Sequence, residues 1–126
     1  MTGERILVVE DNELNMKLFR DVLAAGGYRT LEATTGGEAV ELATEHAPDL
    51  VLMDIQLPDL DGVQALGRLR ENERTAAIPV LALTAQAMDG DRERFLAAGF
   101  NGYLSKPVNV RELMGTVRLH CDGGAR

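Results

Sequence analysis

The segment LVLMDIQLPDLDG, residues 50–62, joins an apolar run to a carboxylate and then to a turn of proline, aspartate and glycine. Unbroken apolar character is typical of a strand that is covered on both faces, as the strands of a parallel sheet are. Asp54 would therefore end a buried strand, where its charge must be compensated. This segment predicts both a parallel sheet and a second charged group near Asp54.

Two other runs have the same character: RILVVED at residues 5–11 and IPVLALTA at residues 78–85 are apolar and end near polar side chains. Weaker strands are predicted at residues 28–33 and 102–105. Apolar residues at helical spacing lie between the strands. The expected helices run from residue 12 to the glycines at 26–27, from residue 34 to the proline at 48, and over about residues 63–72, 89–98 and 110–120.

Alternating strands and helices predict an α/β fold of five βα units, because parallel strands need crossover connections. The crossovers are right-handed, so the helices cover both faces of a doubly wound sheet. Ligands of such folds bind outside the carboxyl ends of the strands. The polar residues at these ends would therefore meet in one crevice: Glu10, Asp11, Asp54, Thr84 and Lys106.

Three of these side chains are carboxylates, which would repel one another and raise their own pKa values without a counter-charge. Zinc would need histidine or cysteine ligands, so Glu10, Asp11 and Asp54 favour Mg²⁺, which prefers oxygen. With one Mg²⁺ and Lys106, the formal charges balance. Such a pocket can accept a phosphoryl group on Asp54 as the nucleophile, with Thr84 and Lys106 binding its oxygens.

The composition excludes several classes of function. The chain has 126 residues, enough for one domain, and its 13 Lys and Arg against 20 Asp and Glu give a net charge of −7. An acidic protein is a poor match for nucleic acid or for an anionic membrane surface. The chain has one cysteine, and we find neither a signal peptide nor a bilayer-spanning apolar segment, so we expect a soluble, cytoplasmic protein without disulfides.

Four short motifs end the predicted strands: Glu10-Asp11, Asp54 followed by IQLPDLDG, Thr84-Ala85 and Lys106-Pro107. Together they resemble the receiver domain of bacterial two-component response regulators, over essentially the whole chain. The resemblance implies a five-stranded sheet in the flavodoxin-like order 2-1-3-4-5. The segments VEDNELNMKLF, LMDIQLP and TAQAM are most similar to single-domain members that control cell division. We expect residues 1–126 to form one receiver domain without an output domain, because only CDGGAR follows the last helix.

The resemblance also implies roles for the acidic residues. Asp54 would take a phosphoryl group from a histidine of a sensor histidine kinase or a phosphotransfer protein. Asp11, Asp54 and the backbone carbonyl of Gln56 would bind Mg²⁺ directly, with Glu10 acting largely through water. The protein would be a phosphorylated switch rather than an enzyme, and would catalyse only its own phosphorylation and dephosphorylation. It would be a monomer or weak dimer that contacts a downstream signalling protein.

Further roles follow from the same resemblance. Thr84 and Lys106 would contact the phosphoryl oxygens, and Tyr103 would be the aromatic switch that turns inward when Thr84 moves. The bond from Lys106 to the following proline would be cis, which only bonds to proline adopt at low cost. Gln56 and Gln86 would tune how fast water removes the phosphate. The alternative is a receiver excised from a hybrid histidine kinase, because the EDNxxN opening also occurs there.

The first predicted helix has an unusually wide apolar surface. At ~100° per residue its apolar positions cover an arc of about 200°, wider than the usual buried stripe. Part of this surface should stay exposed unless the helix is deeply buried. We hypothesise that Leu14, Asn15 and Leu18, together with Pro107 and Val108, form the face that docks the phosphodonor.

Simpler interpretations remain for several residues. Asp11 or Asn12 could cap the first helix, Tyr103 could be a core aromatic, and Asp59 and Asp61 are interpreted as solvated turn residues. Two other classes of protein share parts of the pattern. A flavodoxin-like FMN carrier would need a Ser/Thr/Gly-rich loop where EDNELN is acidic. A phosphatase of the haloacid dehalogenase type would typically carry a second aspartate at the position of Gln56.

Overall fold

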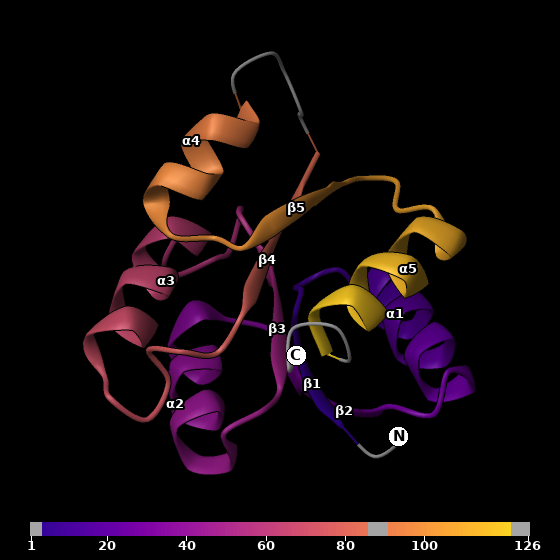
Figure 1. The fold of residues 1–126 in the computed structure, drawn as a ribbon, viewed down its shortest axis with the longest axis horizontal. Helices are drawn as coiled ribbons and strands as arrows, with labels where there is room; N and C mark the ends of the chain where they lie inside the picture. The colour runs from indigo at the N-terminus through magenta and orange to yellow at the C-terminus, as the bar shows by residue number, and fades with distance from the viewer. Residues whose placement is uncertain (1–3, 86–90, 122–126) are drawn as a thin grey trace.

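The computed structural model describes residues 4–85 and 91–121, and along them five strands alternate with five helices (Figure 1). All strand pairs are parallel, in the order β2-β1-β3-β4-β5. The α/β class and the predicted strand order are therefore confirmed. The elements are β1 (Arg5–Val9), α1 (Glu13–Ala25), β2 (Arg29–Ala33), α2 (Gly36–His46), β3 (Leu50–Asp54), α3 (Gly62–Glu71), β4 (Val80–Thr84), α4 (Asp91–Ala98), β5 (Gly102–Ser105) and α5 (Val110–Cys121).

Two layers of helices enclose the sheet, with α1 and α5 on one face and α2, α3 and α4 on the other (Figure 1). Successive strand residues point to opposite faces. In β1, Ile6 and Val8 belong to the apolar cluster with α1 and α5, whereas Leu7 and Val9 belong to the cluster on the other side. Every residue of β3 and β4 is buried. Burial on both faces explains the unbroken apolar runs in the sequence.

Polar side chains fix the ends of the helices. The side chain of Asn12 caps α1 by accepting a hydrogen bond from the backbone N–H of Asn15 at 3.0 Å. Asp61 caps α3 and forms a reciprocal capping box with Gln64. Asp59 accepts hydrogen bonds from backbone N–H groups of α2. Asp59 and Asp61 are exposed residues of the turn before α3, as interpreted, and both also stabilise helix ends.

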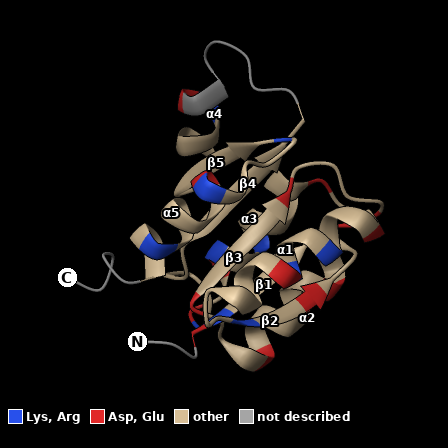
Figure 2. Ribbon diagram, turned by 90° about the vertical axis from the view of Figure 1, so that its right-hand side faces the viewer, with Lys and Arg blue, Asp and Glu red and all other residues tan. Residues whose placement is uncertain are grey.

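The elements differ from the expected ranges by a few residues. β1 ends at Val9, so Glu10 and Asp11 lie in the loop after it. Of the expected fourth helix, residues 89–90 lie outside the described residues. None of the helices in the described part of the chain is long and apolar enough to cross a membrane. Figure 2 shows Lys and Arg interspersed with Asp and Glu, so this view shows no basic face among the described residues.

Candidate functional site

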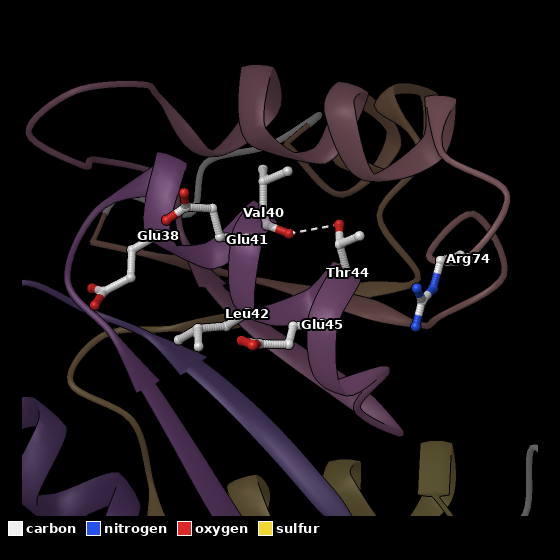
Figure 3. Close-up of a pocket in the computed structure, with 7 residues that line it drawn as sticks. All are labelled: Glu38, Val40, Glu41, Leu42, Thr44, Glu45 and Arg74. Carbon is white, nitrogen blue, oxygen red and sulfur yellow. Dashed lines mark hydrogen bonds between the residues drawn. The ribbon is translucent and has the colours of Figure 1, made fainter.

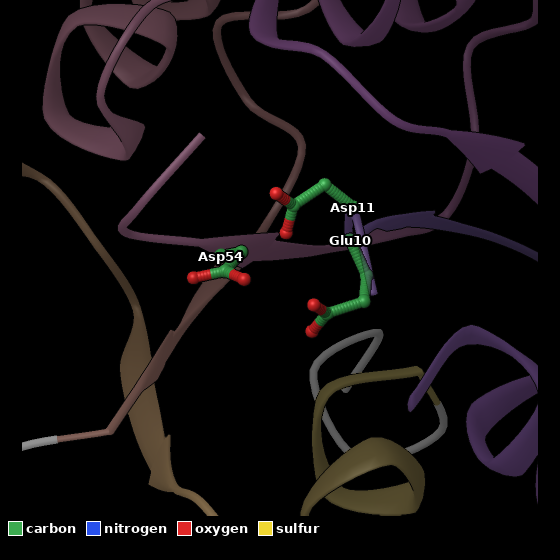
Figure 4. Close-up of side chains that lie close together, drawn as sticks. All are labelled: Glu10, Asp11 and Asp54. Atoms are coloured by element: carbon green, nitrogen blue, oxygen red, sulfur yellow. The ribbon is translucent and has the colours of Figure 1, made fainter. Parts of the chain in front are cut away.

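Three carboxylates meet at the carboxyl ends of two neighbouring strands. β1 and β3 pair in a register that places Val9 opposite Met53. Glu10 and Asp11 follow β1 directly, and Asp54 is the last residue of β3, so the pairing brings them together. One oxygen of each carboxylate lies within 4.8 Å of the others (Figure 4). The structure thus brings together the acidic residues that the sequence analysis selected.

Lys106 supplies the counter-charge that the buried strand end requires. Its Nζ donates a hydrogen bond to Asp54 Oδ2 at 2.7 Å and lies 2.8 Å from Glu10 Oε1. The second contact is an ion pair without hydrogen-bond alignment, because Glu10 Oε1 has no hydrogen-bond partner among the described residues. Glu10 is only 1% exposed and Asp54 only 5%. One lysine therefore bridges two buried carboxylates, while Asp11 is exposed.

The pKa values of the bridge follow from burial and charge. Burial raises the pKa of the Glu10 carboxyl, Asp54 adds to this effect, and Lys106 opposes it. Burial alone would lower the pKa of Lys106. The hydrogen bond to Asp54 and the attraction of both carboxylates, Asp54 and Glu10, outweigh this effect of burial, so the pKa of Lys106 lies above its usual value. Lys106 therefore stays charged at neutral pH.

The ends of β4 and β5 close the crevice on the other side of Asp54. Lys106 N–H donates a hydrogen bond to the carbonyl oxygen of Thr84 at 2.7 Å, and the bond from Lys106 to Pro107 is cis, as expected. Arg94 of α4 also lines the cavity, which no sequence signal predicted. The cavity has a volume of about 170 Å³ and is lined by Asp54, Ile55, Gln56, Thr84, Ala85, Arg94 and Lys106.

The loop after β3 turns back close to Asp54. Gln56 N–H donates a hydrogen bond to Asp54 Oδ1 at 2.9 Å, and Gly62 N–H donates to the carbonyl oxygen of Ile55 at 2.8 Å. A Cβ at position 62 would lie 2.7 Å from the carbonyl oxygen of Asp54, so this closure requires glycine. The loop thereby holds the backbone of Gln56 beside Asp54.

The donor set of the crevice fits a hard divalent cation. Carboxylate oxygens and a backbone carbonyl are the ligands that Mg²⁺ accepts, and waters complete its octahedron. Three carboxylates against the ammonium of Lys106 and the guanidinium of Arg94 still leave excess negative charge. The Oε1 of Glu10 is buried without a hydrogen bond in the described structure. The residues present therefore fit Mg²⁺.

Tyr103 packs in an aromatic cluster beside this crevice. Its half-buried ring lies 5.8 Å from the ring of Phe95 on α4, which also meets Phe100 edge-on at 5.9 Å. The guanidinium of Arg94 lies 4.9 Å from the centre of the Phe95 ring. The expected switch residue thus contacts the helix that carries Arg94 to the cavity. Gln86 lies outside the described residues.

The hypothetical docking residues differ in exposure. Leu14 is 79% exposed and Leu18 is 39% exposed, so α1 does leave part of its apolar surface in solvent. Asn15 is half-buried and Pro107 is exposed. Val108 is half-buried and packs against the apolar cluster that also contains residues of α1 and α5. The two leucines are therefore the members best placed to contact a partner.

A cavity larger than the one beside Asp54 lies next to α2 (Figure 3). It has a volume of about 650 Å³ and is lined by Glu38, Val40, Glu41, Leu42, Thr44, Glu45 and Arg74. The hydrogen bond drawn there, from the Thr44 hydroxyl to the carbonyl oxygen of Val40, is internal to the helix. No strand-end residue lines this cavity, so we assign the functional site to the crevice around Asp54.

Comparison with known proteins shows the family of the chain. The family model of the response regulator receiver domain matches residues 6–118. The chain therefore belongs to the response regulator receiver domain family. It is similar to the polar-differentiation response regulator DivK of Brucella ovis, with 50% identity over 115 residues, which are 91% of this chain and 94% of that protein.

Two solved structures add detail about relatives. The receiver domain of a sensor histidine kinase from Pseudomonas aeruginosa PAO1, with a magnesium ion coordinated in its active site cleft, is 41% identical with a TM-score of 0.85, covering 93% of this chain and 96% of that one. In a Saccharomyces cerevisiae co-crystal, a receiver domain is bound to a histidine phosphotransfer signaling protein. That match is 30% identical with a TM-score of 0.86 and covers 95% of this chain and 90% of that one.

Proposed function

We propose that this protein is a single-domain response regulator that accepts a phosphoryl group on Asp54 in an Mg²⁺-dependent reaction and then changes its contacts with other proteins. The observation that carries the proposal is the Lys106 bridge to the buried carboxylates of Asp54 and Glu10. Similarity to the polar-differentiation response regulator DivK over 91% of the chain supports a role in polar differentiation. We place this role in cell-division control and in the cytoplasm, as the sequence predicts.

In the proposed reaction, a carboxylate oxygen of Asp54 attacks the phosphorus of a phosphohistidine. The P–N bond breaks, and its electron pair stays on the imidazole, which takes up a proton. The ammonium of Lys106 and the hydroxyl of Thr84 line the same cavity and would bind phosphoryl oxygens. Bound Mg²⁺, held by Asp11, Asp54 and the Gln56 carbonyl and through water by Glu10, would supply charge neutralisation. Water later hydrolyses the acyl phosphate, so the protein acts only on itself.

Intact mass after incubation with acetyl phosphate tests the proposal. We expect the native protein to gain one phosphoryl group with Mg²⁺ and none with a chelator, because the excess negative charge around Asp54 would repel the donor. The variant Asp54→Asn should gain none under either condition. Equal gain by native protein and Asp54→Asn, or gain in chelator, would contradict the proposed site.

The partner would be a histidine kinase or a phosphotransfer protein that docks on Leu14, Asn15, Leu18, Pro107 and Val108. The receiver bound to a phosphotransfer protein in the Saccharomyces complex supports this class of partner. The exposed leucines of α1 support the face. In this proposal, phosphorylation shifts Tyr103 and the surface formed by α4, β5 and α5, and this surface then contacts the downstream protein. The protein itself would be a monomer or a weak dimer.

The double variant Leu14→Asp, Leu18→Asp should slow transfer from a phosphotransfer protein about 10-fold or more, because charges replace apolar contacts at the interface. The rate with acetyl phosphate should stay unchanged, since the small donor needs no docking. Leu119→Asp on α5, where the leucine is 64% exposed, is the matched control. A normal transfer rate in the folded double variant would rule out this face.

A receiver excised from a hybrid histidine kinase is the second candidate. The observation that favours it is the 41% identity to the receiver domain of a sensor histidine kinase. Sequencing the native transcript distinguishes the two, since a hybrid kinase would carry a kinase domain in the same reading frame. A reading frame that encodes the receiver alone would exclude the hybrid kinase and support the single-domain regulator.

A further inference from the structure

Asp59 joins two parts of the fold that are distant in the sequence. Its Oδ1 accepts a hydrogen bond from Gly36 N–H at 2.7 Å, and its Oδ2 accepts one from Gly37 N–H at 3.0 Å. These are the first two residues of α2, whose backbone N–H groups have no partner within the helix. The carboxylate also meets the positive end of the helix dipole. A residue of the β3–α3 loop therefore caps another helix from outside.

The two segments are shaped for this contact. A Cβ at position 36 would lie 2.9 Å from the Cβ of Leu60, so the loop can approach α2 this closely only because residue 36 is glycine. The N–H groups of Gly37 and Gly36 hold the pKa of Asp59 below its usual value. The charged form of Asp59 is therefore the form that binds.

The same loop carries Gln56, whose carbonyl belongs to the proposed metal site. At its base the loop is closed by the bond from Gly62 N–H to the carbonyl oxygen of Ile55. At its tip it is held by Asp59. Magnesium demands nearly ideal octahedral geometry, so a ligand that moves by a fraction of an ångström binds it less well. The position of the Gln56 carbonyl thus depends on what holds the tip.

We propose that Asp59 is a positioning residue of the metal site: by tying the tip of the β3–α3 loop to the first turn of α2, it holds the Gln56 carbonyl in place for Mg²⁺. This inference rests on the proposed function. Asp59 touches no metal ligand in the described structure, so it acts through the backbone of residues 56–59. The α2 helix is thereby part of the support of the phosphorylation site.

The variant Asp59→Ala removes the tie, and Thr35→Ala is its matched control. Thr35 caps the same end of α2 through its own side chain, which accepts a hydrogen bond from Glu38 N–H at 3.1 Å, but it does not belong to the loop. Both variants weaken the start of α2, whereas only Asp59→Ala frees the loop. The readouts are the Mg²⁺ dissociation constant from calorimetry and the hydrogen-exchange rate of the Gln56 amide without metal.

We expect Asp59→Ala to raise the Mg²⁺ dissociation constant about 10-fold and to speed exchange of the Gln56 amide, with less than about 2-fold change for Thr35→Ala. Equal effects of the two variants, or no effect of Asp59→Ala on exchange, would overturn the inference. If the native protein binds no Mg²⁺, the proposed metal site fails. The exchange rates then still decide whether Asp59 holds the loop.

Discussion

Replacing Lys106 with methionine should slow phosphorylation by acetyl phosphate about 100- to 1000-fold, the usual cost of removing one preorganised group that stabilises developing charge. Lys106 donates a hydrogen bond to Asp54 at 2.7 Å, and it lines the cavity where the phosphoryl oxygens would arrive. Methionine keeps much of the side-chain volume and removes only the charge and the donors. The rate is measured by quenching the reaction at successive times and determining the phosphorylated fraction from the intact mass.

Mg²⁺ binding separates this effect from a loss of metal. The ammonium of Lys106 lies against both Glu10 and Asp54, so it competes with the cation for their oxygens. We expect Lys106→Met to bind Mg²⁺ at least as tightly as the native protein while it reacts far more slowly. The control is Lys17→Met, which removes the same charge from an exposed pair with Asp21. A native rate in Lys106→Met would contradict the role of Lys106.

The same variant should change how stability depends on pH when a chelator removes the metal. The pKa of Glu10 is raised by burial and held down in part by Lys106, so it rises further without the lysine. A carboxyl whose folded pKa is raised favours the folded state at low pH, and this contribution is lost as pH rises through the folded pKa. The free energy of unfolding, measured with urea between pH 5 and 8, should therefore fall more steeply with rising pH in Lys106→Met than in the native protein.

Much of the fold and of the site's composition could be predicted from short sequence segments. Burial of β3 and β4 on both faces leaves an unbroken apolar run, and parallel pairing then brings Glu10, Asp11 and Asp54 to one edge. The wide apolar arc of α1 correctly predicted exposed apolar surface, as Leu14 shows. These features depend on local periodicity and on general rules of parallel sheets, both of which are visible in one sequence.

Contacts between loops could not be predicted in the same way. Asp59 lies in a turn of ordinary composition, and its partners Gly36 and Gly37 are more than 20 residues away. Arg94 reaches the cavity only because α4 packs beside it. A charged residue in a turn or on a helix surface has the same local pattern whether it faces solvent or another loop. The missing information is the three-dimensional approach of the loops, which periodicity does not encode.

Arg70 is a further residue of this kind, and Arg70→Ala should lower the free energy of unfolding by about 2–4 kcal/mol. Its Nη1 donates hydrogen bonds to the carbonyl oxygens of Ala76 at 3.1 Å and Ile78 at 2.7 Å. Its Nη2 donates to the carbonyl oxygen of Gly99 and to Asn101 Oδ1, both at 3.0 Å. One half-buried guanidinium thus ties the end of α3 to the segments before β4 and after α4.

The loss should exceed that of a surface arginine because the substitution leaves several carbonyl groups without a donor. Asn101 Oδ1 also accepts a hydrogen bond from Val80 N–H at 2.8 Å, so loosening Asn101 would disturb the first residue of β4. Arg70→Lys should recover little, since an ammonium lacks the planar fork of donors. Arg68→Ala, an exposed position on the same helix, should stay within about 0.5 kcal/mol of native protein. Urea unfolding measures the free energy of unfolding of all three variants. If Arg70→Ala lowers it by less than about 1 kcal/mol, these hydrogen bonds do not hold α4 against the sheet.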